Sequence, residues 1–169
     1  EYDYRRDQAL LTAPATLDND QALVELKRYL AKTGILHDDL RKGNANFTPY
    51  RFIGSQLVKA NSISETDFMK VNLFREPIKD FEVAPPNPYE ANISALVSKS
   101  DQRRIVQRSF VYFQIDQEVW ATYPLKDTLQ AWEELKNGQG HIAHLGDNDQ
   151  GEIVIRKVSL AYFDPHTYQ

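Results

Sequence analysis

Two histidines and two aspartates lie within nine residues of one another in the C-terminal third of the chain. His141 and His144 are followed by Asp147 and Asp149, and imidazole and carboxylate groups are ligands that zinc, manganese and iron take in proteins. The nearby glycines indicate a strand or loop, and on a strand two residues three positions apart point to opposite faces. We therefore interpret this segment as part of a hairpin with two exposed histidines, with His141, His144 and Asp147 as the metal-binding alternative.

Other catalytic patterns are missing from the sequence. The chain has no cysteine, which excludes thiolate nucleophiles, disulfides, zinc fingers and iron–sulfur clusters. It contains neither the Gly-x-Ser-x-Gly elbow of serine hydrolases nor a glycine-rich phosphate loop. Adjacent acids such as Asp38 and Asp39 fit a solvated surface better than an acid–base pair. We expect no cofactor and no catalytic residue.

Two groups of side chains predict a ligand or partner surface. A basic cluster precedes the most aromatic stretch of the chain, where it fits an anion or partner contact, or the charges that flank a strand edge. Aromatic rings with a polar end line interaction surfaces or fill the core of a sheet. The candidates are Arg103, Arg104 and Arg108 in the basic cluster, and Tyr112, Trp120, Tyr123 and Tyr162 among the aromatic residues.

The composition indicates one globular domain. The chain has 169 residues, of which 41% are hydrophobic and 26% charged, close to the averages for globular proteins. Its formal net charge of −4 disfavours a nucleic-acid partner, since nonspecific binding to phosphates needs a positive field. The sequence has no apolar run of the ~18 residues that span a bilayer. The first residue is Glu1, which indicates a processed or trimmed chain and leads us to expect an exported or membrane-tethered domain.

The segment at 107–123 predicts the centre of a sheet. It combines aromatic and β-branched residues that fit a pleated surface, and the polar residues at 116–118 interrupt it. We expect two antiparallel strands there, folded into a hairpin. Around it, we predict strands near 50–60 and 67–75, and a last pair at 140–145 and 152–163.

Three helices complete the prediction. Capping residues and apolar spacing indicate a helix at 19–33, another at 88–100 after a proline-rich stretch, and a short one near 127–137. The expected fold is α+β, with a mainly antiparallel or mixed sheet of about five to six strands and about three helices on one face. Residues 1–17 form an N-terminal arm or tether, 18–164 a single domain and 165–169 a frayed tail.

The sequence favours a non-enzymatic protein-interaction module, such as the soluble domain of an envelope or secretion-type assembly. It would bind a protein partner or self-associate, and any membrane contact would use a segment outside this chain. The alternative is a small-molecule-binding domain or enzyme of a cone-shaped α+β type, whose pocket is lined by aromatic side chains and needs no sequence motif.

Overall fold

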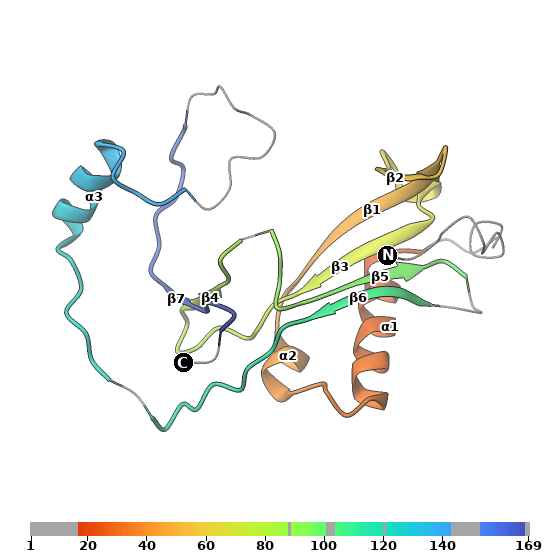
Figure 1. Cartoon of the computed structure of the whole chain (residues 1–169), viewed down its shortest axis with the longest axis horizontal. Helices are drawn as coiled ribbons and strands as arrows, with labels where there is room; N and C mark the ends of the chain where they lie inside the picture. Colours follow the sequence, from red (N-terminus) through yellow and green to blue (C-terminus); the bar gives the residue numbers. More distant parts are fainter. Residues whose placement is uncertain (1–16, 88, 101–103, 120, 143–152, 168–169) are drawn as a thin grey trace.

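A computed structural model describes residues 17–87, 89–100, 104–119, 121–142 and 153–167. Within these ranges, three helices accompany a five-stranded antiparallel sheet and a two-stranded parallel one (Figure 1). The expected α+β class with a mainly antiparallel sheet is confirmed. The predicted arm at 1–17 lies outside the described residues except for Leu17, and so do residues 168 and 169 of the predicted tail at 165–169.

Helix α1 spans Asn19–Lys32, as its capping residues predict. The carboxylate of Asp18 accepts a hydrogen bond of 2.7 Å from the backbone N–H of Gln21 and so satisfies one of the unpaired donors of the first turn. Gly34 ends the helix with a φ of 74°, a left-handed conformation that glycine adopts at low cost. A second, one-turn helix, α2, follows at Asp38–Lys42.

The large sheet has the strand order β2-β1-β3-β5-β6, and each neighbouring pair is antiparallel. Its central strands β3 and β5 are almost fully buried. The strands are β1 (Ala45–Ile53), β2 (Gln56–Lys59), β3 (Phe68–Leu73), β5 (Ile93–Ser98) and β6 (Ile105–Phe110).

The main core lies between α1 and this sheet. Leu26 and Leu30, one helical turn apart, are buried against side chains that alternate along the central strands. On β3 these side chains are Met69, Val71 and Leu73, and on β5 they are Ile93, Ala95 and Val97. A smaller cluster around Phe68 and Leu96 covers part of the other face.

The strand expected near 50–60 is two strands. Gly54 and Ser55 have φ values of 55° and 73°, and two successive residues with positive φ form the tight turn of a β-hairpin. Gly54 therefore makes the turn between β1 and β2.

The helix predicted at 88–100 is also wrong, because most of this segment forms β5. Asn87 does accept a hydrogen bond from the N–H of Tyr89, as in a helix cap. The following apolar residues alternate, however, and this period of two places them between β3 and β6 with one face against α1. Tertiary pairing overrides the local capping signal.

The hairpin predicted at 107–123 as the centre of the sheet is wrong, because the described residues form a single strand there, β6, and β6 lies at the edge of the sheet. Strand β6 ends at Phe110, which pairs with Ile93, the first residue of β5. Val111 still donates a hydrogen bond to the carbonyl oxygen of Asn92, and the chain then leaves the sheet toward Arg75, which donates to the carbonyl oxygen of Phe113. Residues 111–119 and 121–127 have no regular secondary structure.

The last predicted strand pair is wrong over most of its described length. Gly140–Ile142 and residues 153–160 belong to no strand, and 143–152 lie outside the described residues. Only Ala161–Phe163 forms a strand, β7, which pairs in parallel with β4 at Glu82–Ala84.

The third helix, α3, spans Thr128–Lys136 close to its predicted position. Asp127 caps it, with its carboxylate 2.8 Å from the N–H of Leu129. None of its residues is buried, and Figure 1 shows it on the side of the molecule away from α1. Among the described residues, no helix has the length and apolar content needed to cross a bilayer.

Candidate functional site

The side chain of Arg75 is the centre of a buried polar cluster. It follows β3, is 2% exposed and donates hydrogen bonds to two carboxylates from distant parts of the sequence. Its Nη1 lies 2.8 Å from Oδ2 of Asp39 in α2, and its Nε lies 3.2 Å from Oδ2 of Asp164 after β7. Its Nη2 also donates to the carbonyl oxygen of Phe113. One guanidinium therefore joins three segments to the end of β3.

Tyr112 closes this cluster on the side of α2. Its hydroxyl donates a 2.9 Å hydrogen bond to Oδ1 of Asp39, and the guanidinium carbon of Arg75 lies 4.2 Å from its ring centroid. The ring also stacks on His37 with a centroid distance of 4.3 Å. Burial and the hydrogen bond to Asp39 raise the pKa of Tyr112 to about 12, so the phenol stays protonated at neutral pH.

Asp164 is held in its charged form. Burial alone would raise its pKa, but hydrogen bonds from the N–H of His166 and from Asn92, together with the charge of Arg75, hold the pKa of this carboxyl below its usual range. The amide nitrogen of Asn92, a residue at the start of β5, donates at 2.8 Å. This ionised state contributes stability above the ordinary carboxyl pKa, and the contribution is lost as the pH falls through the lowered value.

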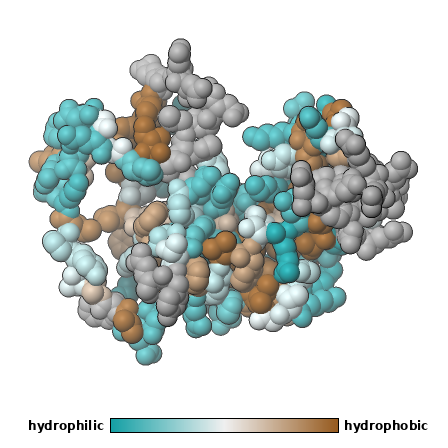
Figure 2. All heavy atoms as spheres, viewed as in Figure 1, coloured by the Kyte–Doolittle hydropathy of each residue, from teal (hydrophilic) through white to brown (hydrophobic). Residues whose placement is uncertain are grey.

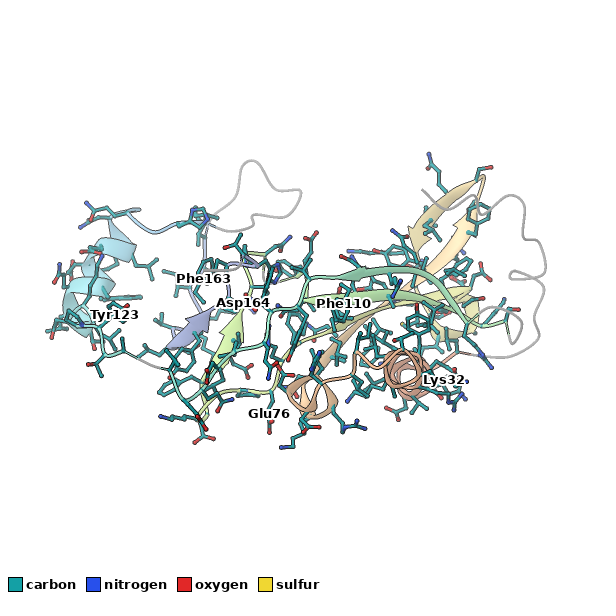
Figure 3. The ribbon with its side chains drawn as sticks, turned by 60° about the horizontal axis from the view of Figure 1, so that its bottom comes forward. Lys32, Glu76, Phe110, Tyr123, Phe163 and Asp164 are labelled. Carbon is teal, nitrogen blue, oxygen red and sulfur yellow. The ribbon has the colours of Figure 1, made fainter. Side chains whose placement is uncertain are left out.

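The chemistry of the cluster is that of a fixed cross-link. One guanidinium is shared by two carboxylates, and the phenol donates a hydrogen bond to one of them, so these side chains hold one another in place. The cluster instead fixes the place where the C-terminal half of the chain leaves the sheet. Figure 3 shows Asp164 between the sheet that ends at Phe110 and the segments that carry Phe163 and Tyr123.

Replacing Tyr112 with phenylalanine should change how stability depends on alkaline pH. Below pH ~10 the wild-type chain keeps the full hydrogen bond to Asp39, worth about 1.5 kcal/mol for a charged acceptor. Between pH ~10 and the raised pKa of about 12, the unfolded state loses its tyrosine proton first. The advantage of wild type over Tyr112→Phe therefore shrinks across this window. Urea denaturation of both proteins at pH 8, 10 and 11.5 measures this difference in stability. A difference that does not change with pH would contradict the hydrogen bond between Tyr112 and Asp39.

Two cavities flank the cluster, and Arg75 lines both. The smaller, of about 280 Å³, is polar and lies between α2 and Tyr112. The larger, of about 500 Å³, lies between the segment that follows β6 and the segment around β7. Tyr123 and Tyr162 line the larger cavity together with Phe113 and Ile115.

The structure brings the predicted aromatic residues to one region without burying them. Tyr123 is 81% exposed and Tyr162 is 46% exposed, with Tyr162 packed edge-on against Phe81. Tyr112 is partly buried in the Arg75 cluster. Trp120 lies outside the described residues. Among the described aromatic candidates, Tyr112 lines the smaller cavity and also packs against the main core, whereas Tyr123 and Tyr162 line the larger cavity.

The predicted basic cluster is not a single patch among the described residues. Arg108 extends over the ring of Tyr29 on α1, with its guanidinium carbon 5.5 Å from the ring centroid. Arg104 donates to the carbonyl oxygen of Lys99 at 3.4 Å, and Arg103 lies outside the described residues. Arg108 and Arg104 thus make contacts within their own chain.

The metal-binding alternative finds no support in the described part of the chain. His141 is exposed, whereas His144, Asp147 and Asp149 lie outside the described residues. No group of three or more metal-ligating side chains occurs among the residues that the structure describes.

Sequence reasoning missed the Arg75 cluster. It interpreted Asp38 and Asp39 as solvated surface, but Asp39 accepts hydrogen bonds from both Arg75 and Tyr112. The available signal was an arginine directly after a buried strand, a position where a charge needs a partner. Its partners are 36 and 89 residues away, and no local pattern identifies them.

Comparison with protein-family models, with curated proteins and with solved structures finds no match for this chain. The geometry of the chain itself therefore carries any inference about its function.

Proposed function

We propose that this chain is a non-enzymatic protein-interaction module, and that its C-terminal half is the part that binds. The observation behind this proposal is the distribution of burial. Every described residue that is buried lies between Leu17 and Ser100. Residues 113–142 and 153–163, called the exposed arm below, contain no buried residue among those described.

The exposed arm is rich in large apolar side chains of the kind that folded proteins usually bury in a core or an interface. Figure 2 shows apolar residues at the surface on the side of α3. Exposed apolar area of this extent marks interaction surfaces. Its large exposed members are Phe113, Ile115, Val119, Tyr123, Leu125, Leu129, Trp132, Ile142, Ile153, Val154, Ile155, Val158, Leu160, Tyr162 and Phe163.

Along the described part of the arm almost every residue is exposed, and only Glu134 and Leu135 are partly covered. The charged groups of the Arg75 cluster are engaged in contacts between distant segments of the chain, which supports a structural role for the cluster.

Replacing Tyr123 with glutamate is expected to weaken the complex about 30-fold, the effect of removing one aromatic anchor worth about 2 kcal/mol. The protein would be affinity-purified from its native cells, the recovered partner quantified by mass spectrometry, and the dissociation constant measured with purified components. Tyr89→Glu is the matched control, since Tyr89 is also exposed, at 65%, but lies outside the arm.

Equal binding by the Tyr123→Glu and Tyr89→Glu variants would contradict the location of the binding surface. A chain that recovers no partner and stays monomeric at every concentration would contradict the function itself.

Small-molecule binding is the second candidate, and the larger cavity is the observation that favours it. Its volume of about 500 Å³ is within the range of roughly 300–1,000 Å³ that ligand pockets occupy. Native mass spectrometry of the protein purified from its own cells separates the two functions. A stoichiometric small molecule that Tyr162→Ala removes would favour this candidate over a protein partner.

A further inference from the structure

We propose that the partner is a second copy of this chain, and that the two copies exchange strands of opposite charge. The acidic segment 114–119 of one copy would pair with the basic segment 153–158 of the other, twice in a symmetric dimer. This inference rests on the proposed function and identifies the partner that would bind the exposed arm.

Both segments have the composition of strands but are not in a sheet. The first contains Ile115 and Val119, and the second contains Ile153, Ile155 and Val158, all of them exposed. Branched side chains of this kind favour pleated, paired backbone. Neither segment pairs with another strand among the described residues. Figure 1 shows them on separate paths, one leaving β6 and the other descending to β7.

Their charges are complementary. Asp116 and Glu118 are the charged residues of the first segment, and Arg156 and Lys157 are those of the second. All four side chains are exposed. An antiparallel register that places Glu118 opposite Arg156 also places Val119 opposite Ile155. Opposite charges and apolar pairs directly across a ladder each stabilise it by about 0.2–1 kcal/mol.

The Arg75 cluster holds the chain near one end of each segment at the same point of the fold. Phe113, just before the acidic segment, and Asp164, a few residues after the basic one, both accept hydrogen bonds from Arg75. The larger cavity is lined by the acidic segment and by residues 162–165, which follow the basic segment in the sequence. Each copy therefore presents one acidic and one basic strand from a common anchor, and a twofold axis would bring the acidic strand of each copy to the basic strand of the other.

One argument favours a second copy over pairing within one chain. A single two-stranded ribbon is only marginally stable in water, whereas two ribbons brought together make a sheet of four strands with an apolar face to bury.

Charge reversal distinguishes these arrangements in the full chain. Light scattering after size exclusion should give wild type twice the 19.5 kDa of one chain. Glu118→Lys alone and Arg156→Glu alone each place two like-charge pairs in the dimer, so each should weaken it at least about tenfold. Glu65→Lys reverses an exposed charge outside the exposed arm and should leave the dimer unchanged.

Mixing the two single variants is the decisive measurement. In a strand-exchanged dimer of Glu118→Lys with Arg156→Glu, both ribbons regain opposite charges, so the mixture should dimerise as tightly as wild type. The double variant Glu118→Lys/Arg156→Glu should do the same by itself. If only the double variant regains stability, the strands pair within one chain and the inference fails.

A wild-type chain that is monomeric at all concentrations would also overturn the second copy as partner. The protein-interaction function would survive that result if the chain still bound a different protein through Tyr123, so failures of the two proposals are distinguishable.

Discussion

Replacing Arg75 with methionine should lower the free energy of unfolding by about 3–5 kcal/mol, because it leaves two carboxylates without their counter-charge in a buried site. The side chains of Asp39 and Asp164 are only 27% and 10% exposed, so water replaces the guanidinium poorly. The variant also leaves the carbonyl oxygen of Phe113 without its donor. Urea denaturation at pH 7, followed by far-UV circular dichroism, gives the loss.

Two further variants show whether charge or packing causes the loss. Arg75→Lys keeps the charge but lacks the forked guanidinium that reaches both carboxylates and the carbonyl oxygen. Its free energy of unfolding should therefore lie between those of wild type and Arg75→Met. Removing one carboxylate from the methionine variant, as Arg75→Met/Asp164→Asn, should recover part of the stability at pH 7. A methionine variant within 1 kcal/mol of wild type would show that the cluster behaves like a solvated surface ion pair.

Replacing Gly43 with alanine should destabilise the chain by about 3 kcal/mol, at the upper end of the usual cost of overpacking. A Cβ at this buried glycine would lie 1.8 Å from the carbonyl oxygen of Phe74, which is backbone and has little room to move. The clash would separate the end of α2 from the end of β3. Those two elements carry Asp39 and Arg75, so the substitution should also loosen the Arg75 cluster.

Gly34→Ala is the matched control for this prediction. A Cβ at Gly34 would meet no atom within 4 Å, and only its φ of 74° opposes a side chain. A left-handed conformation costs a non-glycine residue about 1–2 kcal/mol. Urea denaturation should therefore give Gly43→Ala a clearly lower free energy of unfolding than Gly34→Ala. Equal stability of the two variants would mean that α2 and β3 can separate at no cost in free energy.

Local signals in the sequence correctly predicted the two helices that are stabilised by contacts between near neighbours. The capping residue Asp18, the apolar spacing of α1 and the left-handed Gly34 are contacts within a few residues of one another. The same holds for α3, which Asp127 caps. The α+β class followed from such elements, because alternating and helical apolar patterns must pack in layers.

The errors occur where distant segments decide the outcome. Residues 93–98 follow a capping signal and three prolines, yet they form a strand because β3 and β6 offer hydrogen bonds on both sides. Residues 153–160 have strand composition, yet they form no strand because no neighbour lies beside them among the described residues. A strand needs a partner, and its sequence does not specify where that partner is.

The amino-acid sequence by itself determined the fold class, the first and last helices and the lack of thiol, nucleotide or cofactor signatures, because these depend on composition and on contacts between near neighbours. Only the tertiary structure identified the Arg75 cluster, since Asp39 and Asp164 reach the guanidinium from opposite ends of the chain. It also decided which apolar residues are covered. The first half of the chain supplies a helix to bury the sheet, whereas the exposed arm has no such layer among the described residues.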